Sequence, residues 1–281
     1  MVSIVAGAGT QLHIVGHGLT IADAFTLKPG ITVTSHKPSH EQPIITTMGQ
    51  LHASTTILLM EQIASFSLRI EEPAGGKALA HKGWNALWIF SLLALACRSP
   101  CFSLYSITED KKFTLANRNL VIRPLPQLVA FTREHQQWAA DSLVRFDKLL
   151  DDDQFRTSMR YYNNAHYLFD DDAKLMLLWA GIEGLLRVES ELSRRIALHA
   201  AILFDGDKEQ KAAHFLQVKK AYTIRSKVVH GSGADAAALK DAYIFASELL
   251  IGLLRKMVDL GRVPSASELD RLAVSASLSN A

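Results

Sequence analysis

The amino-acid sequence predicts a mainly α protein, in which a C-terminal helical bundle follows a smaller α+β N-terminal region. Three observations lead to this prediction. β-branched residues mix with glycine and proline over the first 50 residues, apolar residues recur at steps of three and four from Arg133 onward, and the later segments are joined by short connections. The 281 residues suffice for one or two domains. We expect an α+β region over 1–125, a helical domain over 126–262 and a tail over 263–281.

Short strands and two helices are expected in the first region. β-branched runs bounded by turn residues predict strands at residues 12–15, 24–27, 31–34, 102–107 and 119–123. A helical repeat covers 55–70 and ends at the Pro/Gly-rich segment 73–76, and a second, more apolar repeat covers 84–96. This region is therefore expected to be an α+β module.

Six amphipathic helices are expected after residue 132. The apolar repeats place them at 133–150, 155–168, 175–186, 191–204, 209–229 and 239–254. Gly231 is the residue type best suited to a left-handed helix end after the fifth of them. Helices joined by short connections are typical of a bundle. The tail, rich in Ser and Ala, is expected to form a short helix or to stay disordered.

The composition excludes several classes of protein. The chain has 30 Lys and Arg against 28 Asp and Glu, a formal charge of +2, so a nucleic-acid site must come from a local cluster. Two cysteines, Cys97 and Cys101, are too few for a disulfide-stapled secreted domain. The longest apolar run, 83–97, is shorter than the roughly 20 residues of a membrane span, and the first basic residue is Lys28, unlike in a signal peptide. We expect a cytoplasmic protein without a membrane partner.

Several motifs resemble metal or cofactor sites, and each has a simpler interpretation. The aspartate runs 151–153 and 170–172 precede helices, where carboxylates cap free amide groups; a divalent-metal site is the alternative. Residues 7–9 (Gly-Ala-Gly) lack the third glycine of a dinucleotide fingerprint. Cys97 and Cys101 are one residue further apart than a redox pair and are expected to be structural. Two histidine pairs have four-residue spacing but no third ligand nearby: His13/His17 and His36/His40. We expect neither a metal nor a cofactor.

The segment 211–234 is the strongest candidate for chemistry. It contains no acidic residue and five basic ones: Lys211, Lys219, Lys220, Arg225 and Lys227. Arg225 offers a planar set of donors to phosphate, and His230 titrates near neutrality and can transfer protons. Five positions of an α-helix rotate a side chain by about 140°, so the two do not share a face unless the helix unwinds near 228–231 or a partner chain contributes. The simpler interpretation is a surface arginine and a helix-terminal histidine.

Three blocks of the helical region carry a resemblance to a known family. They are LMLLWAGIEGLLR at 175–187, ELSRRIALHAAILF at 191–204 and AYTIRSKVVHG at 221–231. In order and spacing they resemble the ApeA-like branch of the HEPN superfamily, whose motif is an arginine followed, after four to six residues, by a histidine. The resemblance covers residues 133–260 and leaves 1–125 without an assignment.

The resemblance implies a helical domain that dimerises and brings two Arg/His motifs into one cleft. Many members are metal-independent endoribonucleases of toxin, phage-defence and RNA-processing systems. The implied partners are RNA, a second copy of this chain, and an antitoxin or a defence-system protein. By the same analogy His230 is the catalytic general acid/base and Arg225 holds the scissile phosphate. Further RNA contacts are expected from the polar residues around them: Lys219, Lys220, Ser226 and Lys227.

Two other functions stay open on the sequence alone. Active members of the superfamily often have Asn, Asp or His directly after the arginine, where this chain has Ser226. The first alternative is therefore a non-catalytic HEPN module that binds RNA, a nucleotide or a partner protein. The second is a different enzyme whose chemistry lies in the N-terminal half.

Overall fold

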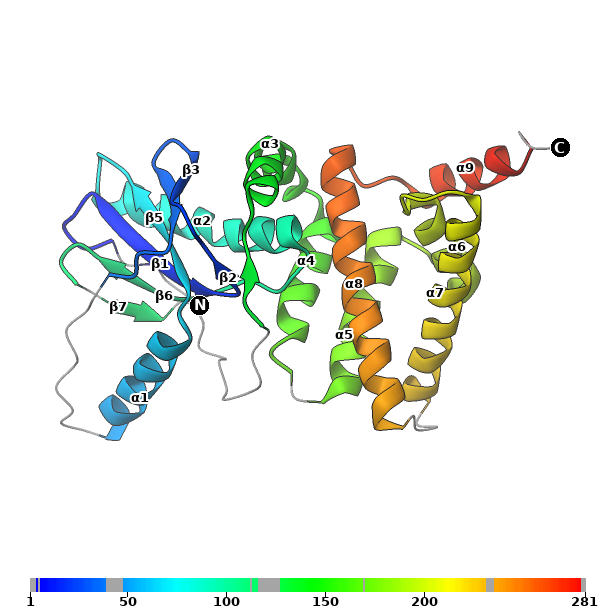
Figure 1. The fold of residues 1–281 in the computed structure, drawn as a ribbon, viewed down its shortest axis with the longest axis horizontal. Helices are drawn as coiled ribbons and strands as arrows, with labels where there is room; N and C mark the ends of the chain where they lie inside the picture. Colours follow the sequence, from blue (N-terminus) through cyan, green and yellow to red (C-terminus); the bar gives the residue numbers. More distant parts are fainter. Residues whose placement is uncertain are drawn as a thin grey trace. The chain divides into compact units, whose positions relative to one another are not determined.

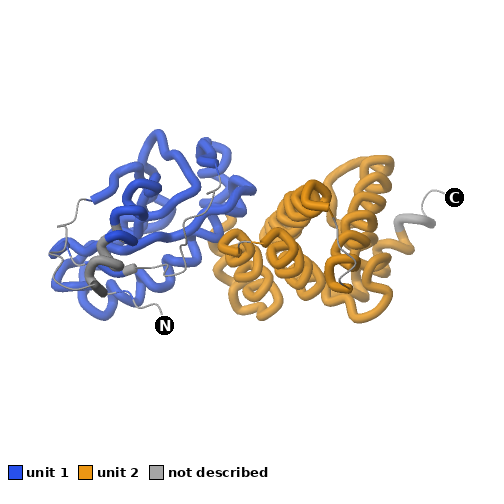
Figure 2. The backbone as a smooth tube through the Cα atoms, turned by 90° about the horizontal axis from the view of Figure 1, so that it is seen from below, with its two compact units in different colours: residues 1–141 blue, residues 142–281 orange. Residues whose placement is uncertain are grey.

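The computed structural model describes residues 4, 6–38, 48–111, 113–115, 127–168, 170–230 and 235–278. The chain divides into two compact units, Met1–Asp141 and Ser142–Ala281, which are coloured separately in Figure 2. The first unit combines strands and helices, and the second is helical (Figure 1). The predicted fold class, a mainly α protein with an α+β N-terminal region and a C-terminal helical bundle, is confirmed.

The core of the first unit is a sheet that, within the described residues, has six antiparallel strands in the order β3-β4-β5-β1-β6-β7. These are β1 (Gln11–His17), β3 (Phe25–Lys28), β4 (Ile31–Thr34), β5 (Phe66–Glu71), β6 (Phe102–Thr108) and β7 (Phe113–Leu115). A parallel pair joins β2 (Leu19–Thr20) to β8 (Val129–Ala130). The strands predicted at 12–15, 24–27, 31–34 and 102–107 are confirmed. The strand predicted at 119–123 lies outside the described residues.

Helix α2 (Gly76–Cys97) packs against the central strands of this sheet. Leu12 and Ile14 of β1 are fully buried. A Cβ added to Gly16, the next residue on that face, would lie 2.3 Å from the Phe90 ring of α2. Only glycine allows the helix and strand to approach this closely. The helix predicted at 84–96 is confirmed, although it begins earlier than expected, at Gly76.

The helix predicted over 55–70 is wrong in its second half. Helix α1 (Met48–Ile63) ends before residue 64, and β5 begins at Phe66. Phe66, Leu68 and Ile70 are all fully buried and alternate along the strand, and Leu68 pairs with Ile14 of β1. An alternating buried face between two neighbouring strands therefore outweighs the helical repeat that the sequence suggested.

The helices from residue 133 onward follow the predicted ranges closely. They are α3 (Arg133–Leu149), α4 (Asp153–Ala165), α5 (Asp171–Leu186), α6 (Leu192–Leu203), α7 (Lys208–Val229), α8 (Ala236–Leu260) and α9 (Ala266–Leu278). The boundary between the two units falls within α3. The tail contains a helix, α9, which is one of the two expected outcomes. No helix of the described ranges is both long and apolar enough to cross a membrane.

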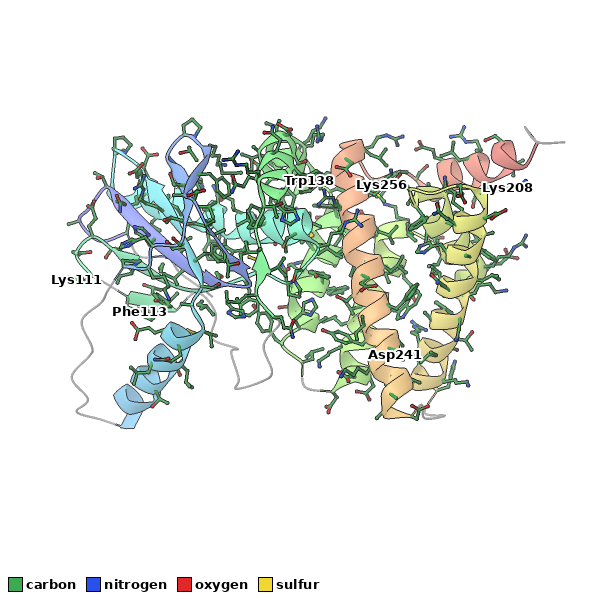
Figure 3. The ribbon with its side chains drawn as sticks, in the orientation of Figure 1. Lys111, Phe113, Trp138, Lys208, Asp241 and Lys256 are labelled. Carbon is green, nitrogen blue, oxygen red and sulfur yellow. The ribbon has the colours of Figure 1, made fainter. Side chains whose placement is uncertain are left out.

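Helix α5 is central to the second unit, with α4, α7 and α8 packed around it. Trp179 of α5 is fully buried. A Cβ on Gly181 would lie 2.8 Å from the Leu250 side chain, so glycine allows α5 and α8 to pack closely, and the buried Ser158 hydroxyl of α4 donates to the Gly181 carbonyl at 2.8 Å. Helices α7 and α8 are antiparallel, and Lys208 of α7 and Asp241 of α8 lie at opposite ends of this pair (Figure 3).

Candidate functional site

Helix α7 carries both residues of the predicted Arg/His motif. A capping box fixes its start: the Gln210 N–H donates to the Asp207 side chain and the Asp207 N–H donates to the Gln210 side chain, each at 2.9 Å. The helix continues to Val229, and the His230 N–H still donates to the Ser226 carbonyl at 3.1 Å. The described part of the motif is therefore a regular helix end, without the unwinding that would bring its two residues together.

Arg225 lies on the buried side of α7 and is held by a carboxylate of α5. One of its terminal nitrogens, Nη2, lies 3.0 Å from Glu183 Oε1 and donates to Glu183 Oε2 at 3.3 Å. The two side chains are 23% and 21% exposed, so the ion pair is largely shielded from water. The attraction within such a pair is stronger than at the surface but is offset by the cost of desolvation, and either member alone is costly to leave unpaired.

Two aromatic rings complete this cluster. The Tyr222 ring lies 5.4 Å from the Arg225 guanidinium carbon and packs edge-on against Trp179, with ring centroids 5.2 Å apart. A guanidinium next to an aromatic face is favourable because the ring quadrupole attracts a cation. Arg225 Nε and Trp179 Nε1 are buried and have no hydrogen-bond partner among the described residues. The cluster therefore keeps unused donors next to the ion pair.

Burial favours the neutral forms of Glu183 and Tyr222, and the Arg225 charge opposes this effect at both residues. Burial raises the pKa of the Glu183 carboxyl, and the Arg225 charge opposes this shift. Burial also raises the pKa of Tyr222; the Glu183 charge adds to this effect and Arg225 counteracts it. Removing the Arg225 charge therefore favours protonation of Glu183.

His230 lies on the other side of α7, where the side chains are exposed. At about 100° per residue it is about 140° away from Arg225, on the same side as Thr223 and Lys227. His230, Thr223 and Lys227 are all exposed. Among the described residues no hydrogen bond or ion pair joins Arg225 to His230. Within one chain the structure therefore does not bring the two predicted catalytic residues together. Gly231, the predicted helix end, lies outside the described residues.

The predicted RNA contacts divide into exposed lysines and one partly buried serine. Lys219, Lys220 and Lys227 are exposed, and Lys219 Nζ lies 5.8 Å from the Phe215 ring centroid. Ser226 is half-buried, and its carbonyl accepts the His230 N–H. The lysines are thus accessible to a polyanion, whereas Ser226 chiefly supports the helix end.

Glu183 is the residue that sequence reasoning missed. The segment 211–234 contains no acidic residue, yet an acidic side chain 42 positions earlier in the chain pairs with its arginine. A signal was present: Glu183 is the one charged residue between Leu175 and Leu186, in an apolar stretch of α5. A lone charge within an apolar helical repeat indicates a buried partner.

The first aspartate run caps a helix, as predicted. The Asp152 side chain accepts the N–H groups of Gln154 and Phe155, both at 3.0 Å. Its second oxygen lies 2.7 Å from an Arg187 terminal nitrogen. Asp152 therefore joins the start of α4 to the end of α5, and its oxygens are engaged.

The second aspartate run begins α5 in a different way. Asp170 is at the N-cap position without a side-chain hydrogen bond to the helix, and Asp171 in the first turn pairs with Lys174 at 2.7 Å. The run was expected to cap free amide groups, and it does so through Asp172, whose side chain accepts the Ala173 N–H at 2.7 Å, and not through Asp170. Across the described ranges, no three His, Cys, Asp or Glu side chains are grouped so that they could hold a metal ion.

The histidine pairs and the cysteines have structural surroundings. His13 Nδ1 lies 3.0 Å from the Ser67 hydroxyl, and His17 Nδ1 lies 2.6 Å from the Ile63 carbonyl. Burial, followed by the charges of His36 and Arg69, lowers the pKa of His13 to about 4. Of the two cysteines predicted to be structural, Cys97 is half-buried and its thiol donates to the Ala94 carbonyl at 3.7 Å, whereas Cys101 is buried. His40 lies outside the described residues.

Comparisons with known proteins add no family assignment. No family model matches the chain, and searches of the curated proteins and of the solved structures find no significant match.

Proposed function

We propose that this protein is a HEPN-type endoribonuclease that cleaves RNA without a metal ion, with Arg225 and His230 as its catalytic residues. The proposal rests on the resemblance of residues 133–260 to the ApeA-like HEPN branch. A role in phage defence or in a toxin system, with an antitoxin or defence protein as a partner, follows from the same resemblance. The single observation that supports it best is the placement of Arg225 and His230 at the end of one helix within a helical bundle.

The proposed chemistry needs three functions, and the residues of α7 can supply each of them. His230 is exposed and can exchange a proton with the RNA 2′-hydroxyl or with the leaving oxygen. Arg225 would bind the scissile phosphate and stabilise the charge that develops on it. Lys219, Lys220 and Lys227 would neutralise flanking phosphates. Attack by the 2′-hydroxyl breaks the bond to the 5′-oxygen and leaves a 2′,3′-cyclic phosphate.

The proposed active form is a homodimer through the helical unit. Arg225 and His230 point to different sides of α7, so an arginine from one chain and a histidine from the other would have to share a site. A two-fold axis places the same surface of each chain together and produces two such sites. Light scattering should therefore give twice the 31.0 kDa chain mass at the concentrations where activity is measured.

The test is incubation of the purified protein with total RNA, with and without EDTA, beside His230→Ala and the control Gln217→Ala on the exposed side of α7. We expect the wild type and Gln217→Ala to cleave RNA in both conditions and to leave products with cyclic phosphate ends. His230→Ala should not cleave RNA. Cleavage that EDTA abolishes and Mg²⁺ restores would contradict the metal-independent mechanism.

A non-catalytic HEPN module is the second candidate, and one observation favours it. The Arg225 guanidinium is already engaged by Glu183 and lies away from His230. A module of this kind predicts no cleavage by the wild type and a loss of RNA affinity in Arg225→Ala as large as in the lysine variants. The same set of variants therefore separates the two functions.

A further inference from the structure

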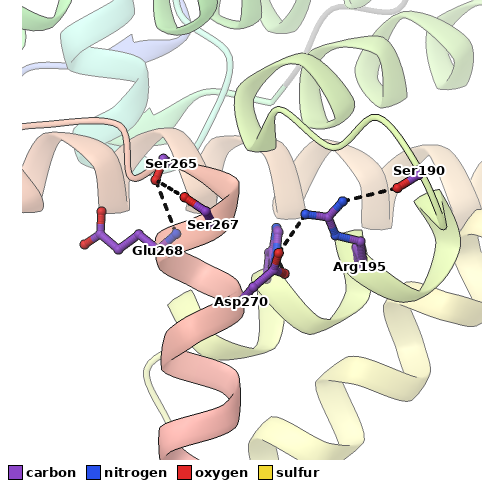
Figure 4. Close-up of polar contacts among 7 residues, drawn as sticks. Ser190, Arg195, Ser265, Ser267, Glu268 and Asp270 are labelled. Atoms are coloured by element: carbon purple, nitrogen blue, oxygen red, sulfur yellow. Dashed lines mark hydrogen bonds and ion pairs between the residues drawn. The ribbon is translucent and has the colours of Figure 1, made fainter.

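A second arginine and histidine of the helical unit converge on one carboxylate. Arg195 Nη2 lies 2.7 Å from Asp270 Oδ2, and His199 Nε2 lies 2.8 Å from Asp270 Oδ1. Arg195 Nη1 also donates to the Ser190 hydroxyl at 3.4 Å (Figure 4). Arg195 and His199 are four positions apart on α6, so they share a face of that helix. Asp270 comes from α9, 71 positions after the histidine.

Arg195 and His199, which we call the donor set, both belong to α6, whereas the carboxylate that they bind belongs to α9. His199 is fully buried, and because a carboxylate only accepts, the hydrogen lies on His199 Nε2. Its other nitrogen, Nδ1, is buried without a hydrogen-bond partner in the described part of the chain. The Asp270 side chain is 41% exposed, so one side of the carboxylate faces water. The hydrogen bond from His199, followed by the one from Arg195, lowers the pKa of Asp270 and keeps it ionised.

Helix α9 presents much of its described apolar surface to water. It packs against α6, and of its apolar side chains Leu269 is buried, whereas Leu272 and Val274 are 46% and 60% exposed. Its start is held by contacts within its own segment: the Ser265 hydroxyl accepts the Glu268 N–H, and Arg262 binds the Glu268 carboxylate. The helix start therefore does not depend on Asp270, whereas Leu269 and Asp270 both join the helix to the rest of the unit.

We propose that Arg195 and His199 form a binding site for a phosphate-class oxyanion, and that Asp270 of α9 is its internal occupant. Two donors that converge on the two oxygens of one carboxylate can equally converge on two oxygens of a phosphate. A phosphate dianion carries more charge than the Asp270 carboxylate, so the same two donors attract it more strongly. Because the ligand and Asp270 need the same donors, ligand binding releases α9, and release of α9 strengthens ligand binding by the same factor. The inference is independent of RNA cleavage.

The test uses the full chain, inorganic phosphate as the probe and two readouts: phosphate binding by titration calorimetry at constant ionic strength, and hydrogen exchange of the α9 amides. Asp270→Asn removes the internal anion and keeps the shape of the side chain. We expect it to bind phosphate at least tenfold more tightly than the wild type, with α9 amides that exchange at least tenfold faster. Adding Arg195→Gln to it should abolish the binding. The control Asp241→Asn, on an exposed site of α8, should behave as the wild type.

Two results would overturn the proposal. One is equal phosphate affinity in the wild type, in Asp270→Asn and in the double variant. The other is α9 exchange in the wild type that saturating phosphate leaves unchanged. If Asp270→Asn does not fold, Leu269→Ala weakens the α9 anchor and leaves the donor set and Asp270 in place. It should also bind phosphate more tightly than the wild type, and an unchanged affinity contradicts the coupling.

Discussion

Two arginine–histidine pairs lie on the described helices α6 and α7, and they differ in whether their side chains converge within a single chain. Arg225 and His230 are five positions apart on α7, and the structure directs one to the buried Glu183 and leaves the other exposed. Arg195 and His199 are four positions apart on α6 and bind the same carboxylate. The difference teaches that the helical period, and not the residue types, decides which pairs converge without a partner chain.

Both arginines share a second property. Each is paired with a carboxylate that is distant in sequence, Glu183 at 42 positions and Asp270 at 75 positions. An arginine in a helical bundle that is not fully exposed keeps its charge and needs such a partner. A ligand that approaches either arginine therefore competes with an internal anion.

The largest effect is expected when the histidine of the Arg225/His230 pair is removed. His230→Ala should lower RNA turnover by about a hundredfold or more, because proton transfer is lost while the phosphate contacts remain. RNA affinity should change little, since His230 lies apart from Arg225. Turnover and filter binding measure the two quantities, and circular dichroism shows first that the variant is folded. Loss of the folded state in His230→Ala would instead make the imidazole a structural helix-end residue.

Acid should destabilise the second unit through the buried His166. Burial, followed by the Lys174 charge, lowers the pKa of His166 to about 4, and its Nδ1 lies 2.8 Å from the Tyr243 hydroxyl. An unfolded chain binds this proton near pH 6.5, so the free energy of unfolding should fall as the pH drops from 6.5 to 4 and level off below. For one such histidine the loss is about 3 kcal/mol.

Two variants test this pH dependence by urea denaturation at pH 7.5, 5.5 and 4. His166→Gln should flatten the fall, because its side chain does not titrate. The control Gln217→Ala, an exposed position on α7 that carries no titratable group, should leave the slope unchanged. An equal slope in His166→Gln and the wild type would contradict the assignment. His13, whose pKa is also about 4, should account for part of the slope that remains.

A smaller effect is expected at the carboxylate that holds Arg225. Glu183→Gln removes the ion pair and leaves a largely buried guanidinium without its counter-charge, so the free energy of unfolding should fall by about 1 kcal/mol. Glu189→Gln, at an exposed position three residues after α5, is the control and should change nothing. The midpoints of urea denaturation measure the difference, provided that the dependence of the unfolding free energy on urea concentration is unchanged. A more stable Glu183→Gln would show that desolvation of the pair outweighs its attraction.

The smallest effects are expected at the exposed lysines of α7. Lys219→Ala and Lys220→Ala should each weaken RNA binding by a factor of about three to ten and reduce the slope of log affinity against log salt by about 0.7 to 1. Gln217→Ala should leave both quantities unchanged. Turnover of bound RNA should also stay constant in the lysine variants, because they do not contact the proposed reacting atoms. A lysine variant with wild-type salt dependence would place the RNA on another surface.

Much of the fold was predictable because its signals are local. The apolar repeats from Arg133 onward gave the helices of the second unit, and β-branched runs gave most strands of the first. The error at 66–70 arose because that segment has apolar residues compatible with both periods. Its strand form depends on pairing with β1 and β4, which no local pattern encodes.

The residue types of the candidate site could be proposed from the sequence, whereas the partners of these residues could not. The Arg225/His230 motif and the exposed lysines follow from the sequence of α7 alone. The ion pair with Glu183 and the convergence of Arg195, His199 and Asp270 depend on how separate helices pack. Charges within apolar repeats, such as Glu183, mark positions where such partners should be sought.

The position of Trp179 makes it an intrinsic fluorescent probe of the Arg225 cluster. The indole is fully buried and lies against Tyr222, which in turn contacts the Arg225 guanidinium. Emission from a buried indole occurs at shorter wavelength than that from the exposed Trp84, and a nearby cation or a displaced ring alters its yield. Occupation of Arg225 by an anion, or loss of Glu183, should therefore change the short-wavelength part of the tryptophan spectrum. Binding of an anion to Arg225 can thus be followed in unlabelled protein, in real time, by its tryptophan fluorescence.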